Sequence, residues 1–586
     1  MRRSLVGTAA VLTALLAVPA PAAWADHTDP REPAAPVDGT TSEAETRGEG
    51  TWRHIANFPG LASPALTGGG TDLEFFRPGR SKDVWGAFGT LGQDEGGSVG
   101  QRLIRLTKDG KVAPRWVADH GSAHCATDNA SVTGLQHDTQ IAKRNGVTLL
   151  TDTTDALGRC HDPDGGGIEI VDVSKIQNRE FKPREVHLVR FAGYTHTNTV
   201  DKKRPWIVYN SSSDFADRNW IDVMDMRSCF GDRSWSLRQR RAECRPKVSR
   251  IQMKPAWTQQ KEGDQLEPGS ATCHDITYKR GRLYCAALNA TVILDVRDIV
   301  NDKGRVRGES FPCKVVAGTS TRAKVTDCSG MGADRKERAR GWSLVGFVNH
   351  PGRDCSPTGD NRNCNTNLEV RSDEGVAVSH EADPSHDGRF MFVTDERGGG
   401  IVPPGASCGP SLDNPYGNGG MHAFDISDPD DIRYARTPEG DKAVFIGDAV
   451  VAAPTFCDVH VIEHVPGEQR LIAAYYSQGI KIVDYYVDDQ GRMQFVERAS
   501  FTLPEANTWA AEHFKIRNNE DGTKTYFIAA DDIHRGIDVL SWRAKPNPIG
   551  AKAPETNDVA RSSSLLGGSL LVVAATAALR RRRRSG

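Results

Sequence analysis

The sequence lacks a long amphipathic helical stretch in its central part, so a helical bundle is not expected. It also has little excess charge: the formal net charge of the 586 residues is -2 at pH 7. No broad basic face is implied, and we expect no nucleic-acid partner. Hydrophobic residues make up 38% of the chain, with 58 Gly and 31 Pro, which suits many short strands joined by tight turns. We predict an all-β fold.

Several catalytic and metal-binding motifs are also missing. The chain has no P-loop, HExxH or CxxC pattern, so the nucleotide-binding loop, the zincin helix, the zinc ribbon and the thioredoxin-type site are disfavoured. A Ser/His/Asp triad is recognised by geometry, so its absence does not follow from sequence. No sequence motif therefore assigns a reaction, and whether the protein is an enzyme stays open at this point.

The N-terminus is typical of an export signal. Two arginines precede an apolar run at residues 5–18, and Ala23 and Ala25 suit cleavage before Asp26. We interpret residues 1–25 as a plain secretory signal peptide, with a twin-arginine route as the alternative. Residues 26–48 are expected to be a disordered mature N-terminus. The mature protein is then exported and lies outside the cytoplasm.

The twelve cysteines, an even number in an exported chain, indicate disulfides. Close spacing suggests four local pairs, and the even number of cysteines suggests a fifth pair that includes Cys457. The four are Cys229 with Cys244, Cys273 with Cys285, Cys313 with Cys328, and Cys355 with Cys364; the fifth is Cys408 with Cys457.

The C-terminus carries an apolar run at residues 565–579, followed by a basic tail at 580–586. The run is short for a bilayer span of about 20 residues, but the arginines after it can snorkel and stop transfer. We predict a transmembrane segment with a cytoplasmic tail, preceded by a linker at residues 544–564. No LPxTG motif precedes it. The protein is thus expected at the outer face of the cell membrane or on the cell surface.

A strand pattern recurs along the chain. "GGGIEIVDVS" at 165 returns as "NWIDVMDM" at 219, "ATVILDVRDI" at 290, "GGMHAFDISDP" at 419, "QGIKIVDYY" at 478 and "RGIDVLSW" at 535. Each copy follows another strand and precedes a further apolar strand, at a period of about 60 residues. Four short antiparallel strands at such a period are typical of a propeller blade. The pattern predicts seven blades within residues 49–543.

The last unit lacks a fourth strand, whereas "TWRHIANF" at 51 precedes the first unit. We therefore predict that the N-terminal strand completes the last blade and closes the ring, which removes exposed sheet edges. His274 and His380 are 106 residues apart, so residues 303 to about 370 are interpreted as a Cys-containing insertion without strand rhythm. An eighth blade hidden there is the alternative.

The repeated stretch resembles the LVIVD repeat of exported bacterial and archaeal β-propeller proteins, and the likeness covers roughly residues 50–545. The resemblance implies a surface or secreted propeller. It supplies no catalytic residue, because the motif in that family is a structural strand. The weak first unit, Ser541 in place of the terminal Asp, and the large insertion depart from the family pattern.

A column of histidines opens the units. It consists of His137, His196, His274, His380 and His513, with Cys457 in the sixth place and Asp72 in the first. If this place begins the innermost strand, the rings meet near the axis at one mouth of the channel. They could then hold one transition-metal ion, copper, iron, zinc or manganese, because neutral imidazole suits these ions. Carotenoid-cleaving oxygenases hold iron this way, an analogy at the level of fold only.

A structural role is the competing interpretation. Each His could instead hydrogen-bond the neighbouring blade, as repeat-specific histidines of WD-repeat propellers do. The acidic residues that follow, Asp138, Asp275, Glu381 and Asp458, could orient the rings or pair blade to blade, and we favour the pairing. Acidic loops at 161–167 and 425–431 could hold calcium but are more typical of solvated turns.

Two functions follow from these observations. The first is an exported, cell-surface-anchored propeller that acts as a binding or interaction module for an extracellular protein, glycan or small-molecule ligand, with contacts made by its loops and insertion. The second is an extracellular metalloenzyme, redox or hydrolytic, with the metal held by the ring of histidines at the axis.

Overall fold

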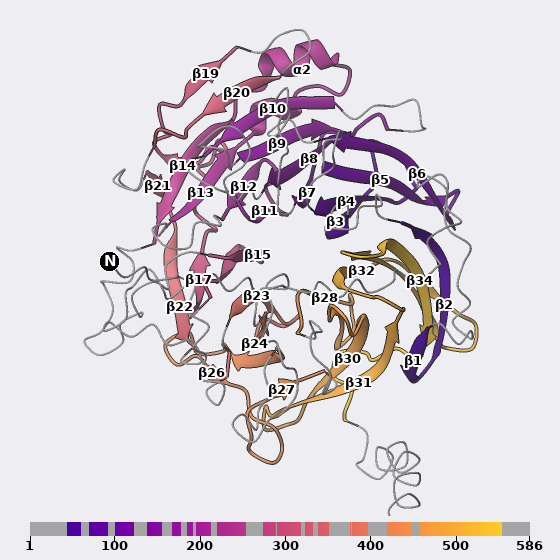
Figure 1. The fold of residues 1–586 in the computed structure, drawn as a ribbon. Coiled ribbons are helices and arrows are strands. Elements are labelled where there is room, and N and C mark those ends of the chain that lie inside the picture. Colours follow the sequence, from indigo (N-terminus) through magenta and orange to yellow (C-terminus); the bar gives the residue numbers. More distant parts are fainter. Residues whose placement is uncertain are drawn as a thin grey trace, which may run out of the picture.

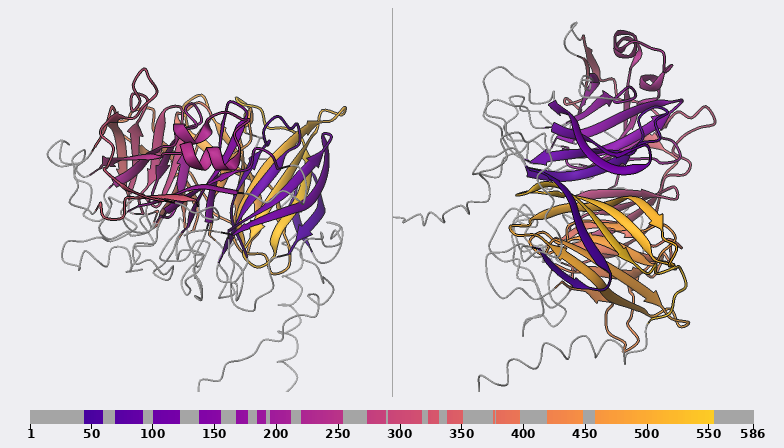
Figure 2. Two further views of the ribbon diagram at one scale, coloured as in Figure 1. Left: turned by 90° about the horizontal axis from the view of Figure 1, so that it is seen from above. Right: turned by 90° about the vertical axis from the view of Figure 1, so that its right-hand side faces the viewer.

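The structure of the chain is a computed structural model. It describes residues 44–59, 69–91, 100–121, 137–154, 167–176, 184–191, 195–211, 220–253, 273–288, 290–317, 323–331, 338–350, 375–376, 378–396, 419–447 and 458–553. Seven antiparallel sheets are arranged around a common axis (Figure 1), and the ring is seen from its side in Figure 2. The predicted seven-bladed β-propeller is confirmed.

The first four blades follow one another along the chain. Blade 1 contains β3 (Gly69–Phe76), β4 (Trp85–Leu91), β5 (Gly100–Lys108) and β6 (Lys111–Gly121). Blade 2 contains β7 (His137–Arg144), β8 (Val147–Thr154), β9 (Gly167–Asp172) and β10 (Arg184–Arg190). Blade 3 contains β11 (Asn198–Val200), β12 (Ile207–Asn210), β13 (Trp220–Asp225) and β14 (Lys247–Gln252). Blade 4 contains β15 (Asp275–Lys279), β16 (Arg282–Ala286), β17 (Ala290–Asp295) and β22 (Ser343–Asn349).

The last three blades complete the ring. Blade 5 contains β23 (Ser379–Pro384), β24 (Phe390–Asp395), β25 (Met421–Asp425) and, both paired with β25, β26 (Arg433–Tyr434) and β27 (Val444–Phe445). Blade 6 contains β28 (Ile462–His464), β29 (Arg470–Ala474), β30 (Ile480–Val487) and β31 (Met493–Thr502). Blade 7 contains β32 (Thr508–Asn518), β33 (Lys524–Asp532), β34 (Gly536–Ala544) and β2 (Thr51–Phe58).

The N-terminal strand closes the ring as predicted. β2 pairs antiparallel with β34, so that Trp52 lies opposite Trp542 and Phe58 opposite Ile537. A further strand, β1 (Glu45–Gly48), pairs with β31 on blade 6. β1 falls within residues 26–48, so Glu45–Gly48 form a strand where disorder was expected from the sequence. The reason is that β31 has a free outer edge, which the chain covers on its way to β2.

The core is divided among the gaps between blades. Each of the seven interfaces between neighbouring sheets holds one cluster of buried apolar side chains. Between blades 7 and 1, for example, Phe58 of β2 packs with Leu73 of β3 in one cluster. Because side chains alternate between the two faces of a strand, each buried strand supplies two interfaces. This explains why the repeated strands are continuously apolar.

The insertion within blade 4, between β17 and β22, contains strands, contrary to the expectation of no strand rhythm. They are β18 (Arg307–Gly308), β19 (Lys314–Val316), β20 (Lys324–Asp327) and β21 (Ala339–Arg340). β20 pairs parallel with β10 and β19 pairs with β20, so the insertion extends blade 2 at the rim of the ring (Figure 1). The four strands are two to four residues long, which is why no periodicity is visible in the sequence. They form no eighth blade in the described part of the insertion.

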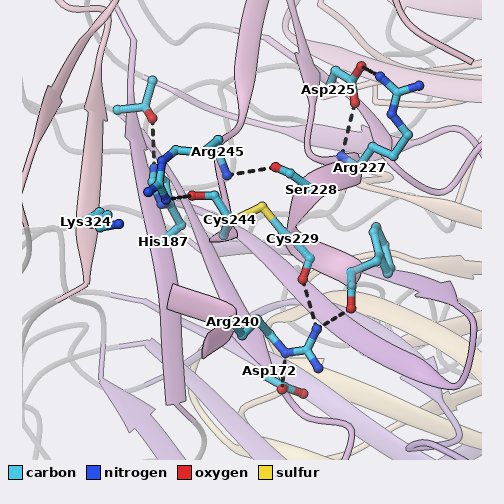
Figure 3. Close-up of a disulfide and its surroundings, with 12 residues drawn as sticks. Asp172, His187, Asp225, Arg227, Ser228, Cys229, Arg240, Cys244, Arg245 and Lys324 are labelled. Carbon is cyan, nitrogen blue, oxygen red and sulfur yellow. Dashed lines mark hydrogen bonds and ion pairs between the residues drawn. A yellow bond between two sulfur atoms is a disulfide. The ribbon is translucent and has the colours of Figure 1, made fainter. Parts of the chain in front are cut away.

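Three of the predicted disulfides are present, namely Cys229–Cys244, Cys273–Cys285 and Cys313–Cys328. Cys355, Cys364, Cys408 and Cys457 lie outside the described residues. The first disulfide joins the segment between β13 and β14, which holds α1 (Arg227–Phe230) and α2 (Leu237–Glu243) (Figure 3). Ser236 caps α2 in a capping box with Gln239.

Arg240 of α2 joins this segment to blade 2. Its side chain is buried, its Nε donates to Asp172 Oδ2 at 2.8 Å, and its Nη1 donates to the carbonyls of Cys229 and Phe230 (Figure 3). The guanidinium thus holds two blades and the disulfide loop together. Its planar fork of donors suits several acceptors at once.

The structure describes only a part of the segments predicted at the two ends of the chain. The first residues of the predicted 544–564 linker are ordered, since Asn547 N donates to Glu468 Oε2 and Pro548 bridges to Glu468. The signal peptide at 1–25 and the apolar run at 565–579 lie outside the described residues. No helix within the described part of the chain has the length and apolar character of a membrane span.

We expect Arg240→Ala to lower the free energy of unfolding by about 3 kcal/mol, because it removes one partner of a buried ion pair and leaves the carbonyl groups of Cys229, Phe230 and Asp232 without this donor. Urea denaturation followed by tryptophan fluorescence measures the loss. Arg238→Ala on the exposed face of the same helix is the matched control and is expected to change the midpoint little. Equal midpoints for the two variants would contradict the role of Arg240.

Candidate metal centre at the propeller axis

Five aromatic rings form an arc at the start of the innermost strands, one from each of blades 3 to 7. The ring centroids are 4.1 Å apart for His196 and His274, 4.5 Å for His274 and His380, 4.1 Å for His380 and His460, and 4.4 Å for His460 and Trp509. All five side chains are buried. The arc thus brings together side chains from five blades that are far apart in the sequence.

Three of the predicted histidines, His196, His274 and His380, are therefore brought together. The sixth place is taken by His460, three residues after Cys457, which lies outside the described residues. The seventh place is taken by Trp509, four residues before His513. The repeated strand motif tolerates an offset of a few residues, whereas the ring contacts do not. The motif therefore predicted the wrong residue at the axis in blades 6 and 7.

His513 and His137 lie elsewhere. The Nδ1 atom of His513 lies 2.7 Å from Glu463 Oε2, which also accepts a hydrogen bond from the His513 backbone N–H. The Nδ1 atom of His137 lies 2.8 Å from Asp152 Oδ2 on the neighbouring strand of its own blade. Neither imidazole has a ring contact with the arc among the described residues.

The carboxylates that follow the histidines serve the pairing between blades. Asp72 accepts a hydrogen bond from Thr139 N, Asp138 from Asn198 N at 2.6 Å, and Glu381 from Ile462 N at 2.7 Å, each on the next innermost strand. Asp72 thus belongs with these carboxylates and not with the histidines.

The other two acidic residues behave differently. Asp275 caps its own strand at Ile276 N, and Asp458 lies two residues before His460, not after it. The favoured interpretation, blade-to-blade pairing, therefore applies to Asp138 and Glu381.

Glu396 adds a carboxylate to the arc. It lies directly after β24, with Oε2 3.4 Å from His380 Nε2 and Oε1 3.7 Å from His460 Nε2. The Tyr476 hydroxyl donates a hydrogen bond to Glu396 Oε1. Tyr476 and Glu396 are both buried, and the tyrosine ring lies 5.3 Å from the ring of His460. Tyr476 thus fixes the orientation of Glu396 toward the imidazoles.

Burial keeps the imidazoles of His380 and His460 neutral. It lowers the pKa of His380 to about 3, with a further contribution from the nearby His196, and it lowers the pKa of His460 well below its usual value. The Nδ1 atom of His380 and both ring nitrogens of His460 have no hydrogen-bond partner among the described residues. Buried polar atoms without partners are costly, so a ligand on these nitrogens would offset that cost. His422 and His464 also have buried ring nitrogens without a partner among the described residues, so this feature alone does not mark a metal site.

Burial has the opposite effect on the acid. It raises the pKa of Glu396 to about 7, although the hydrogen bond from Tyr476 and the proximity of His196 act in the other direction. The ligand atoms of His274, His380 and Glu396 all lie within 4.8 Å of one another. Ligands of one ion are typically 2.0–2.2 Å from it, so small side-chain rotations bring these three into one coordination sphere. The residues therefore fit a transition metal.

The acidic loops give no support to calcium. In the 425–431 segment, Asp425 accepts from Ser427 N and Asp428 accepts from Asp430 N, so both side chains cap turns. The loop at 161–167 lies outside the described residues except for its last position.

Sequence reasoning missed His460, Glu396, Tyr476 and Trp509. His460 was visible within "CDVHVI", where it stands two residues before the strand β28, and Glu396 follows "RFMFVTD" directly. Their signal is positional only: each lies at the axial end of a repeated strand. Nothing in the sequence separates such a Glu or Tyr from the leucine at the matching end of blade 4.

No protein-family model matches the chain, and no curated protein matches it. Similar solved structures include the Cps50 (Swd1) β-propeller domain of Myceliophthora thermophila, with 10% identity, a TM-score of 0.36, and coverage of 82% of this chain and 97% of that one. The periplasmic gluconolactonase PpgL of Pseudomonas aeruginosa has 12% identity, a TM-score of 0.35, and coverage of 78% and 96%. Sqt1 of Chaetomium thermophilum has 10% identity, a TM-score of 0.37, and coverage of 80% and 82%. Membership of the LVIVD family stays a prediction.

We expect the metal-free protein to lose stability between pH 5 and pH 8 through Glu396. Its pKa is raised in the fold, so its stabilising contribution is present below the unfolded value of 4.5 and is lost as the pH rises through about 7. The loss approaches about 3 kcal/mol. Glu396→Gln cannot ionise, so its unfolding free energy relative to the parent should increase over this range.

Urea denaturation at pH 5 and pH 8 in the presence of a chelator measures this difference. The comparison between variant and parent cancels the other titrating groups. Glu520→Gln, at an exposed position of blade 7, is the control and should follow the parent at both pH values. A constant difference between Glu396→Gln and the parent would show that Glu396 ionises as freely in the fold as in the unfolded chain.

Proposed function

We propose that the chain is a metal-binding propeller in which His274, His380 and Glu396 hold one transition-metal ion at the axis, with His196 and His460 beside them. The observation that carries the proposal is the meeting of these three ligand atoms within 4.8 Å in a buried site. Neutral imidazoles with a single carboxylate suit iron, copper, zinc or manganese. We propose a metal-dependent reaction, redox or hydrolytic, at this site.

The chain's own residues prepare the site in three ways. Burial keeps His380 neutral, so a lone pair is available without loss of a proton. Tyr476 orients Glu396, and an oriented carboxylate binds an ion more tightly than a mobile one. The apolar surroundings exclude bulk water and strengthen electrostatic interactions in the site. A bound ion would supply Lewis acidity or electrons, which none of these side chains offers.

The proposal is tested by metal analysis of the full chain, produced without a polyhistidine tag and incubated with copper, iron, zinc and manganese salts in turn. We expect about one ion per chain for the preferred metal. His380→Ala should abolish stoichiometric binding, because it removes a central ligand. Tyr476→Phe should weaken affinity by about 10-fold or more, because Glu396 loses its orienting hydrogen bond.

His422→Ala is the matched control. His422 is a buried histidine of blade 5 whose pKa burial also lowers to about 3, but its Nδ1 lies beside Tyr434 away from the arc. The control should therefore keep the metal. Equal metal content in His380→Ala and His422→Ala, or no uptake of any of the four metals, would overturn the proposal. A folded, metal-free parent would support the alternative of a module that binds an extracellular protein, glycan or small molecule.

We further propose that the protein is exported and held at the outer face of a membrane. The signal-like N-terminus, the run at residues 565–579 and the basic tail support this, and the three disulfides suit an oxidising compartment. The mature chain should begin at Asp26 by N-terminal sequencing. Deletion of residues 565–586 should move the protein from the membrane fraction to the medium. Unchanged fractionation of the deletion variant would rule out anchoring by this segment.

A further inference from the structure

A second group of buried titratable side chains lies between blades 1 and 2, away from the arc. His120 of β6 has its Nε2 atom 2.8 Å from Glu169 Oε1 on β9. His137 of β7 has its Nδ1 atom 2.8 Å from Asp152 Oδ2 on β8. Both are His–carboxylate pairs at hydrogen-bond distance, and both carboxylates are fully buried. Two such pairs in one interface form a cluster that the metal centre does not use.

The two pairs are joined by the register of the sheet. Asp152 and Glu169 are direct partners in the pairing of β8 with β9. Side chains of direct cross-strand partners stand about 5 Å apart at Cβ, so a single water molecule or a rotation of Glu169 spans the two carboxylates. The order across the interface is therefore His120, Glu169, Asp152, His137. We call this set the interblade row.

The inner end of the interblade row reaches the level of the metal centre. His137 begins the innermost strand of blade 2, at the place that His196 takes in blade 3 and His274 in blade 4. Its Nε2 atom is fully buried and has no hydrogen-bond partner among the described residues. Asp152 on Nδ1 leaves this second nitrogen as the position that can pass a proton on.

The outer end is closer to solvent. The His120 side chain is 10% exposed, whereas the side chains of His137, Asp152 and Glu169 have no exposed surface. Neighbouring Glu169 and Asp152 raise the pKa of His120 against the effect of burial. Glu185 of β10 is another acid near the row. The Nε atom of Arg241 of α2 donates a hydrogen bond to the backbone carbonyl of Glu185. Thr139 of β7 donates a hydroxyl to Asp152 Oδ1 at 3.3 Å.

We propose that the interblade row is a proton relay between the rim of blade 1 and the axial end of blade 2, serving the reaction at the mouth. A proton leaves His120 Nε2 for Glu169, moves from Glu169 to Asp152, and passes from Asp152 Oδ2 to His137 Nδ1. The transfer ends on His137, which then carries a proton on each ring nitrogen. Each step forms one O–H or N–H bond and breaks another, with no change of oxidation state.

The proposal rests on the metal centre for its purpose but not for its test. A relay must titrate as one coupled unit, and it must lose that coupling when the Glu169 carboxyl is removed, whereas Coulomb coupling between the two histidines would survive its removal. The discriminating quantity is thus whether the protonation of His120 is felt at His137 through Glu169. This can be measured on the metal-free protein, so the outcome of metal analysis does not affect it.

The experiment is a pH titration of the full chain labelled with ¹⁵N-histidine and followed by NMR. His120→Gln and His137→Gln identify the two ring signals. In the parent protein, we expect the His137 ring signal to shift at the pH at which His120 titrates. Glu169→Gln should remove that shift of the His137 signal and lower the His120 pKa, because the amide carries no charge and passes no proton.

The control is Glu396→Gln, which removes a buried carboxylate of the metal centre instead and should leave both histidine titrations unchanged. A parent His137 signal that is blind to the titration of His120 would overturn the relay and leave two structural pairs. This parent measurement can overturn the relay even if Glu169→Gln fails to fold.

Discussion

The structure depends on how the innermost strands are fastened to one another. An innermost strand has a free edge toward the axis, so its backbone groups need partners that a sheet cannot supply. Here a carboxylate of one blade accepts the backbone N–H of the next, as Asp138 does from Asn198 and Glu381 from Ile462. A hydrogen bond from an N–H to a carboxylate is stronger than a neutral one, and it fixes the height of each strand relative to its neighbour. The arc of imidazoles exists because this fastening brings the strand starts to one level.

The same hydrogen bonds between blades bring together ionisable groups whose charged forms are disfavoured by burial. At the axis, burial lowers the pKa of His380 and His460 and raises the pKa of Glu396, since desolvation disfavours the charged form of each. Protonation of these imidazoles at low pH therefore destabilises the fold. Ionisation of buried acids such as Glu396 at high pH does the same. A cation bound between neutral imidazoles and an ionised Glu396 relieves both, because it stabilises the lone pairs and the negative charge together. The proposed metal would thus offset the electrostatic cost of burying these groups.

Sequence alone predicted the all-β class, the seven blades, the closure by β2 and three disulfides, because each rests on a local or periodic pattern. The centre was only half predictable. His196, His274 and His380 follow the column, but Trp509 replaces His513 and His460 replaces Cys457, since the strand register is set by contacts between blades that leave no local pattern. The small strands β18 to β21 escaped for a related reason: they are too short for a period and are held by β10 and β14 from outside.

The specialised side of the ring shows how a repeat acquires chemistry. Leu288 in blade 4 and Tyr476 in blade 6 lie at the same place after the second strand, both have positive φ, and both bridge to the next innermost strand, at Ser379 and Thr508. The backbone arrangement is thus shared, and a non-glycine residue in that region is held there by its surroundings. Leucine at this place only fills space. Tyrosine at the equivalent place reaches Glu396 and turns it toward two imidazoles. The same backbone arrangement thus carries a leucine in blade 4 and a tyrosine in blade 6, and residues on blades 5 and 6 determine where an ion can bind.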